Sequence, residues 1–294
     1  MSFVRLLLVL AFTASFLRAE DPEPELRRTL ERAYSSWKQA IVAQDVSGWQ
    51  QSTAAYRQMA TRNLIVSQKQ PFPHALFAVP VRPPEISTLR FLGTTVKGNT
   101  ANVAYFGKVD LGLVEATQIP DSLLILKFIK ESSGWKFDTT QLFNLGSAPD
   151  IQAALKSGGR ATFLDNPEFA PMGEVPPVPK PCPIPDRIGV LQIASFGYAT
   201  KAAVNGFDVA TVQDNAEEHL VIGGLKNGDN ALVVEAKQVP IPEGAERSLI
   251  INALVLTGDE KRPTIQVFNW KPETHPVTEF QKMTIFVNKI TMRE

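Results

Sequence analysis

The first 145 residues change from a helical to a strand-like spacing of apolar side chains. From residue 26, apolar residues recur every three or four positions and form one stripe on an expected helix: Leu26, Leu30, Tyr34, Trp37 and Ile41. Ser47 and Gly48 then interrupt this pattern. A second helix is expected to follow and to bury Trp49, Tyr56, Met59, Ala60 and Leu64.

Two hairpins are expected next, with the turn sequences KGNT, which contains Gly98, and ESSG. In the last strand, alternation places Lys136, Asp138 and Thr140 on the polar face, so the Asp138 carboxylate is expected in solvent. Four antiparallel strands in this order predict a curved sheet that wraps the first helix and buries its aromatic residues. Residues 21–145 are therefore predicted to form an α+β domain.

Residues 146–187 are expected to connect two domains. The sequence SAPDIQAALKSGG predicts a short helix that starts near Pro149 and ends at Gly158. Eight prolines between Pro167 and Pro185 exclude a helix or a central strand and predict an extended spacer. A proline-rich ligand for the aromatic groove of another protein is the alternative. The first half of the spacer is expected to pack onto a domain through Phe163, Phe169 and Met172.

The spacer contains Cys182, the only cysteine of the chain, between two prolines. A single cysteine excludes an intrachain disulfide. No histidine or carboxylate stands at a catalytic spacing from it, and the flanking prolines remove amides that could stabilise a thiolate. We therefore predict a bystander thiol whose replacement in Cys182→Ser leaves folding unchanged, with an intermolecular disulfide as the alternative.

Residues 188–294 show only strand patterns. Short β-rich runs such as IGVLQIASF, NALVVEAKQVP and RSLIINALVL are separated by turn sequences that include Asn205-Gly206 and Asn227-Gly228. Strands of this length and spacing predict an all-β domain, an antiparallel β-sandwich.

The overall charge and the N-terminus narrow the possible partners. With 30 Lys and Arg against 30 Asp and Glu, the chain has no field that would attract nucleic acid. Residues 1–19 have a positive start at Arg5, a short apolar core and a small residue, Ala19, at the end, as in a signal peptide. The apolar core is shorter than the roughly 20 residues that span a bilayer. We therefore predict an exported bacterial protein, periplasmic or secreted, without a transmembrane segment after cleavage.

Two stretches of the first domain resemble a known family. YSSWKQAIVAQDVSGWQQSTA is similar to the helical opening of the nuclear transport factor 2-like superfamily, and LILKFIKESSGWKFDTTQLF is similar to its closing hairpin. This resemblance implies a cone with a cavity between sheet and helices, which some members use for catalysis and others for binding or dimerisation. In the second domain, HLVIGGLKNGDNALVVEA resembles the galactose-binding-like jelly roll, which implies an accessory or carbohydrate-binding module. An immunoglobulin-like sandwich, which shows similar turns and strands, is the alternative.

Candidate pocket residues in the cone are Tyr34, Trp37, Trp49, Tyr56 and His74, although aromatic residues at helical spacing more often form a plain core. No catalytic set can be placed on the family pattern. The glycine loops, the Gly-x-Ser-x-Gly elbow and the His-Glu-x-x-His motif of common enzymes are absent, and no cofactor is expected.

Two features of the second domain invite a binding hypothesis. Trp270, beside polar residues, is a candidate platform for a sugar in a loop, with edge packing as the alternative. The stretch DNAEEH gathers potential cation ligands, but it is expected to be a solvated acidic loop. The three histidines are scattered through the chain, so no metal site is expected.

These observations favour an exported, non-enzymatic protein of the cell envelope that binds a protein partner or small ligand, and a homodimer is compatible with them. The first alternative is an isomerase- or dehydratase-like enzyme that uses the cone cavity, which would need an acid or base facing that cavity. The second alternative is a carbohydrate-binding accessory protein.

Overall fold

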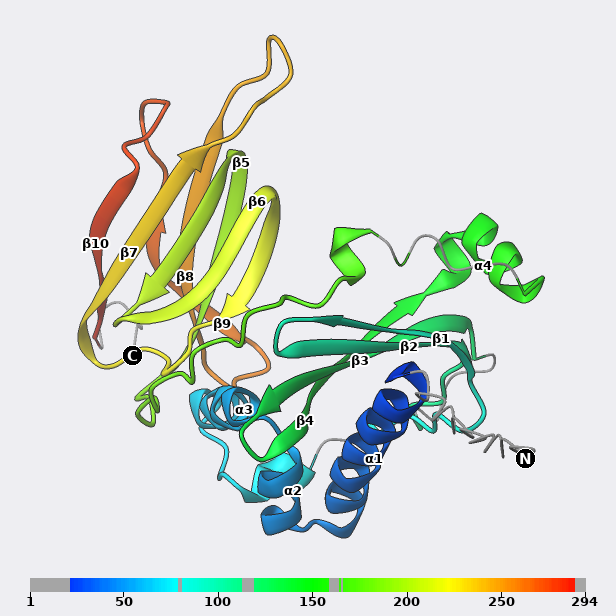
Figure 1. Cartoon of the computed structure of the whole chain (residues 1–294). Coiled ribbons are helices and arrows are strands. Elements are labelled where there is room, and N and C mark those ends of the chain that lie inside the picture. The colour runs from blue at the N-terminus through cyan, green and yellow to red at the C-terminus, as the bar shows by residue number, and fades with distance from the viewer. Residues whose placement is uncertain (1–21, 79–80, 113–118, 159–163, 165, 289–294) are drawn as a thin grey trace, which may run out of the picture.

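The computed structural model describes residues 22–78, 81–112, 119–158, 164 and 166–288, and the expected signal peptide lies outside these ranges. The described residues form four α-helices and two antiparallel sheets, a mixture of an α+β part and a β-rich part (Figure 1). None of the helices in these ranges is long and apolar enough to cross a membrane.

The first sheet contains four strands in the order of the chain. The strands are β1 (Arg90–Lys97), β2 (Thr100–Lys108), β3 (Asp121–Glu131) and β4 (Gly134–Asn144). Both expected hairpins are confirmed, and Gly98 in the first turn has a φ of +52°, which favours glycine.

The expected second helix is interrupted. The helical segments are α1 (Pro22–Ala43), α2 (Val46–Ser52), α3 (Ala55–Ser67) and a 3-10 turn, η1 (His74–Phe77). Between α2 and α3, Thr53 forms a bridge to Phe137 of β4, and the Ala54 amide donates to the Phe137 carbonyl at 2.8 Å. This pairing holds Thr53 and Ala54 in extended conformations, so one continuous helix is excluded.

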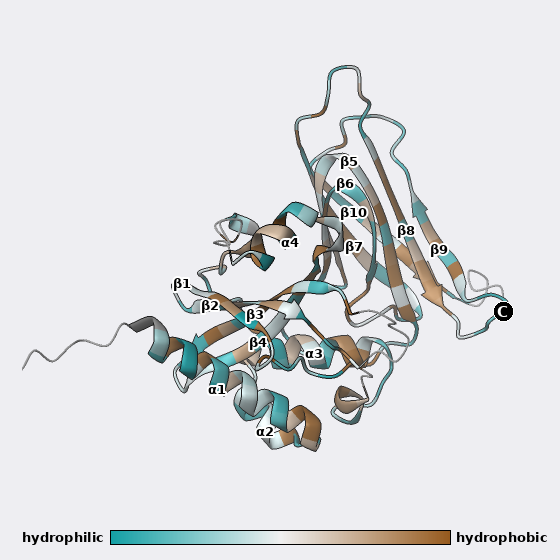
Figure 2. Ribbon diagram, turned by 90° about the vertical axis from the view of Figure 1, so that its right-hand side faces the viewer, coloured by the Kyte–Doolittle hydropathy of each residue, from teal (hydrophilic) through white to brown (hydrophobic). Residues whose placement is uncertain are grey.

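Both faces of the first sheet are covered (Figures 1 and 2). The α1 face is packed through Leu30, Tyr34 and the inward residues of β2 to β4. The other face lies under α4 (Pro149–Lys156) and the 3-10 turn η4 (Pro167–Phe169). Phe169 packs on Phe143 with ring centroids 5.1 Å apart, as expected, whereas Met172 is exposed and Phe163 lies outside the described residues.

A β-bulge in β4 changes which side chains face α1. Lys127 pairs with Thr139, but the next residue, Phe128, pairs with Phe137, so Asp138 is an extra residue in the strand. The bulge shifts the alternation by one position and turns Asp138 to the same face as Phe137. Asp138 is 5% exposed, so the expectation of a solvated carboxylate is wrong.

The second sheet contains six strands. They are β5 (Ile188–Val204), β6 (Phe207–Leu220), β7 (Gly228–Gln238), β8 (Ser248–Leu256), β9 (Thr264–Trp270) and β10 (Phe280–Val287). The runs IGVLQIASF and YATKAAV, expected as two strands, form one long strand, β5. This strand pairs with β8 along its first half and with β7 along its second half. The change occurs at Gly197, whose φ is +73° and whose amide donates to Asp214 Oδ1. Both halves share one core, and a sandwich of two separate sheets stays a prediction.

The proline-rich spacer is anchored to α3 by a joint, which we define as Asn63, Ser67, Cys182 and Gly223. Asn63 is 2% exposed; it donates from Nδ2 to the Lys180 carbonyl and accepts the Cys182 amide at Oδ1, both at 2.9 Å. The Ser67 hydroxyl accepts the Gly223 amide of the β6–β7 loop at 2.7 Å. The joint thus links the first helices, the spacer and the second sheet.

Loss of the Asn63 side chain should destabilise the protein. In Asn63→Ala, the Lys180 carbonyl and the buried Cys182 amide lose their partner, and a buried group costs about 1–3 kcal/mol when left unsatisfied. We expect urea denaturation of the chain without residues 1–19 to show a loss of at least about 2 kcal/mol. The exposed Gln68→Ala in the same helical region is the control, and an equal loss in both variants would contradict the role of the joint.

The thiol in this joint is buried, which the sequence did not indicate, and the expectation that Cys182→Ser leaves folding unchanged stays a prediction. Cys182 is 2% exposed, and its Sγ lies 3.7 Å from Ser67 Oγ. An intermolecular disulfide would require the joint to open. We expect an aromatic disulfide reagent, which forms a mixed disulfide and releases a thiolate, to modify Cys182 in the native chain at least about a hundredfold more slowly than in the urea-unfolded chain, because only the thiolate reacts and it must be reached. Equal rates would show that the thiol is accessible.

Candidate functional site

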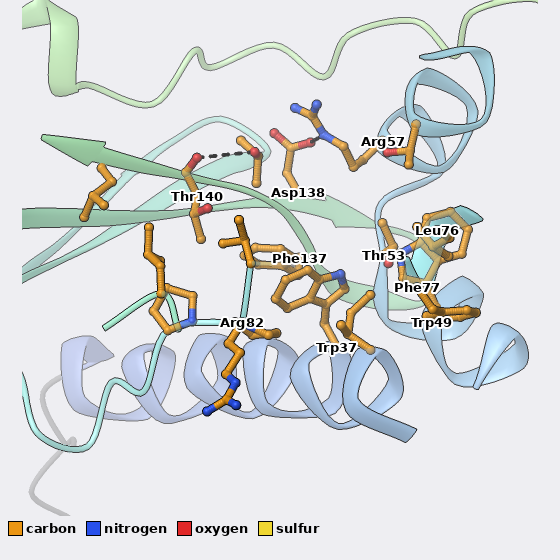
Figure 3. Close-up of a pocket in the computed structure, with 18 of the residues that line it drawn as sticks. Trp37, Trp49, Thr53, Arg57, Leu76, Phe77, Arg82, Phe137, Asp138 and Thr140 are labelled. Carbon is orange, nitrogen blue, oxygen red and sulfur yellow. Dashed lines mark hydrogen bonds and ion pairs between the residues drawn. The ribbon is translucent and has the colours of Figure 1, made fainter. Parts of the chain in front are cut away.

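A cavity of about 420 Å³ lies on the α1 face of the first sheet (Figure 3). It is open to solvent on one side and is lined by residues of α1, α2, α3, η1, the segment at residues 81–84 and strands β3 and β4. Most of its wall is apolar: Trp37, Ile41, Trp49, Leu76, Phe77, Val81, Pro83, Pro84, Leu111, Leu124, Phe137 and Leu142. A cavity of this size and lining suits a small molecule, since typical ligand sites span roughly 300–1,000 Å³.

The aromatic wall is assembled around Phe137. Its ring centroid lies 4.2 Å from that of Trp37 and 5.4 Å from that of Tyr34. Tyr34 stands behind the wall, where its hydroxyl donates to the Pro84 carbonyl at 2.7 Å. Burial raises the pKa of Tyr34 well above its ordinary value, and the negative charge of Glu85 adds to the effect. The phenol therefore stays neutral and holds the 81–84 segment against α1.

A salt bridge forms the polar part of the wall. Arg57 Nε of α3 donates to Asp138 Oδ1 at 2.9 Å, and the side chains are 33% and 4% exposed, respectively. The bulge in β4 brings the carboxylate to this face, and the hydrogen bond to arginine offsets the cost of its burial. Figure 3 shows Arg57 and Asp138 directed toward each other beside Phe137.

Four threonines also line the cavity. Thr61, Thr139 and Thr140 line the cavity near the salt bridge. Thr53, from the extended link between α2 and α3, is 1% exposed, and its Oγ1 has no hydrogen-bond partner among the described residues. A buried hydroxyl without a partner costs free energy. That oxygen has almost no accessible surface, so a molecule in the cavity would reach it only after a local rearrangement.

The structure brings together only part of the expected pocket set. Trp37 and Trp49 line the cavity, and Tyr34 supports its wall. Tyr56 lines a different groove, beside the proline-rich spacer, and His74 is exposed in η1 and does not line the cavity. The α3 helix rotates Tyr56 away because its start is set by the pairing of Thr53 and Ala54 with β4.

Sequence reasoning missed the most polar residues of the site. Arg57 lay on a helix face without any special pattern, and alternation placed Asp138 on the opposite face of the sheet. The bulge that brings Asp138 inward has no glycine or proline to mark it. The one available signal was Asp138 itself, a carboxylate that directly follows an apolar aromatic residue, Phe137.

The candidates of the second half do not form a site. Trp270 is the last residue of β9, pairs with Ile251 and packs half-buried on the core, so it does not stand in a loop. The DNAEEH stretch belongs to strand β6, which corrects the expected loop, and Glu217 bonds His219 at 2.8 Å. Across the described residues, no group of three or more His, Cys, Asp or Glu side chains could hold a metal ion.

Comparison with known proteins gives no match: no protein-family model, curated protein or solved structure is similar to this chain. The resemblances to the nuclear transport factor 2-like superfamily and to the galactose-binding-like jelly roll therefore stay predictions. The chemistry of the cavity residues carries the functional conclusion.

The Arg57–Asp138 salt bridge should be energetically coupled. Arg57→Met leaves the buried carboxylate unpaired, whereas the double variant with Asp138→Asn removes both charges. Because the arginine is one-third exposed, we expect a coupling free energy of about 1.5 kcal/mol, near the lower end for hydrogen bonds to charged groups. Urea denaturation of the four chains of the cycle measures it. Additive losses would show that the pair contributes nothing to stability.

Proposed function

We propose that this protein is an exported binding protein that holds a small, largely apolar molecule in the cavity of its first half. The observation that supports this function best is the combination of an apolar wall with one polar end, the Arg57–Asp138 salt bridge. Ligand sites have this composition, with many apolar side chains for affinity and few polar groups for orientation. The protein needs no cofactor for such a role.

We also propose the domain plan and its family resemblances. Helices α1 to α3 followed by a four-stranded meander, with a cavity between them, are compatible with a nuclear transport factor 2-like cone over residues 21–145. Residues 146–187 would be a connector, and residues 188–294 a sandwich of the galactose-binding or immunoglobulin-like kind. The pattern of residues 1–19 supports export to the periplasm or beyond.

An isomerase- or dehydratase-like enzyme is the second candidate, because Asp138 places a carboxylate in the cavity wall. The salt bridge argues for binding instead, since one oxygen of that carboxylate is engaged by Arg57. For the carbohydrate-binding alternative, Trp270 offers no support, because its ring packs on the core of the second sheet.

The binding function can be tested with N-phenyl-1-naphthylamine, an uncharged apolar dye that fluoresces when it leaves water. We expect saturable binding by the chain without residues 1–19. Thr140→Trp, which fills the cavity from an exposed position in β4, should weaken binding at least about tenfold, equivalent to about 1.4 kcal/mol.

Thr95→Trp is the matched control, because Thr95 is an exposed threonine of β1 that does not line the cavity. This variant should bind the dye as the unmodified chain does. The proposed function fails if the unmodified chain does not bind the dye, or if Thr140→Trp binds it equally well.

A further inference from the structure

The cavity has two chemically different ends. Figure 3 shows the rings of Trp37 and Phe137 between α1 and the sheet, with the side chains of Arg57 and Asp138 on the other side of them. The threonines of the wall join this polar end: Thr61, Thr139 and Thr140. A molecule that fills the cavity would therefore place an apolar body against the rings and a polar group near the salt bridge.

The polar end is electrically balanced by its own residues. Asp138 is almost fully buried, and its charge is compensated by Arg57 at 2.9 Å. A carboxylate ligand would compete with Asp138 for the same guanidinium, and an ammonium ligand would face that guanidinium. Either ion would lose part of its hydration without gaining an unpaired counter-charge, so its binding would be disfavoured relative to an uncharged group.

A second arginine of the wall does not change this balance. Arg82 lines the cavity, but it is exposed, so water and salt screen its charge. Figure 3 places its guanidinium at the end of the site opposite Asp138.

The polar end offers both hydrogen-bond donors and hydrogen-bond acceptors to a bound molecule. Arg57 has no partner for its two terminal nitrogens, and Asp138 none for Oδ2, within the part of the chain that the structure describes. A hydroxyl group can donate to a carboxylate oxygen and accept from a guanidinium or another hydroxyl at the same time.

We infer that the ligand of the cavity is an uncharged molecule with an apolar body and a hydroxyl group, that is, an apolar alcohol or phenol, whose hydroxyl binds at the Arg57–Asp138 salt bridge. This inference rests on the proposed binding function and specifies its ligand class. The salt bridge acts as a neutral hydrogen-bonding platform, and the aromatic wall holds the ligand body.

Four compounds with one shared body test the inference: 2-naphthalenemethanol, 2-naphthoate, 2-naphthylmethylamine and 2-methylnaphthalene. Their dissociation constants follow from displacement of N-phenyl-1-naphthylamine at neutral pH. We expect the alcohol to bind at least about tenfold more tightly than the carboxylate and the ammonium compound, because only the charged compounds bury an uncompensated ion. A carboxylate or ammonium compound that binds most tightly would overturn the inference.

Variants of the salt bridge should change the preferred charge in a defined direction. Arg57→Met leaves Asp138 without a counter-charge, so the ammonium compound should become the best ligand. Asp138→Asn leaves Arg57 without one, so the carboxylate should become the best ligand. If both variants fold and still bind the alcohol most tightly, the salt bridge does not contact the polar group of the ligand.

Thr61→Val keeps the shape of a half-buried side chain that lines the cavity one helical turn after Arg57, and it remains informative if the charge variants fail to fold. It should weaken binding of the alcohol more than binding of 2-methylnaphthalene, whereas the exposed Thr95→Val should change neither. An equal effect on both compounds in Thr61→Val would contradict a polar contact at this end. Dye binding with the wrong order of ligands overturns only the ligand class, while absence of all binding overturns the proposed function as well.

Discussion

Phe137 makes the contacts on which the arrangement of the first half depends. Its ring packs on Tyr34 and Trp37 of α1, and its backbone pairs with the segment that separates α2 from α3. The residue after it, Asp138, is the extra residue of the bulge. One position of β4 therefore sets the distance of α1 from the sheet, the start of α3 and the inward turn of a carboxylate. The cavity is the space that these three constraints leave between them.

Helix α3 connects this cavity to the second half of the molecule. It carries Arg57, which bonds Asp138, and also Asn63 and Ser67, which bond the spacer and the β6–β7 loop. These hydrogen bonds hold the proline-rich spacer against α3, so the spacer is not a free linker. Since the same short helix takes part in both sets of contacts, the position of the guanidinium depends on the joint.

The sequence predicts the regular elements of this fold and misses its irregular ones. The four strands of the first sheet follow from clear alternation and from turn residues such as Gly98, and α1 follows from its apolar stripe. The bulge at Asp138 and the break at Thr53 arise from pairing between segments far apart in the chain, which local patterns do not record. Two of the cavity aromatics could be predicted, whereas the polar end could not, because both of its charged residues depend on these irregularities.

The joint illustrates the same limit. A buried asparagine on a helix looks like a surface residue in a sequence, and a cysteine between prolines looks like part of a free linker. Only the packed structure shows that Asn63 and Cys182 satisfy each other's hydrogen-bonding groups. Polar residues that serve tertiary contacts are therefore the ones that a single sequence hides most effectively.

The most direct test of the central claim is a crystal structure of the chain without residues 1–19 in complex with 2-naphthalenemethanol. We predict density for the naphthalene rings against Trp37 and Phe137, with the hydroxyl within hydrogen-bonding distance of Asp138 or Arg57. Density for the compound at another place, or a cavity filled by protein side chains, would contradict the account.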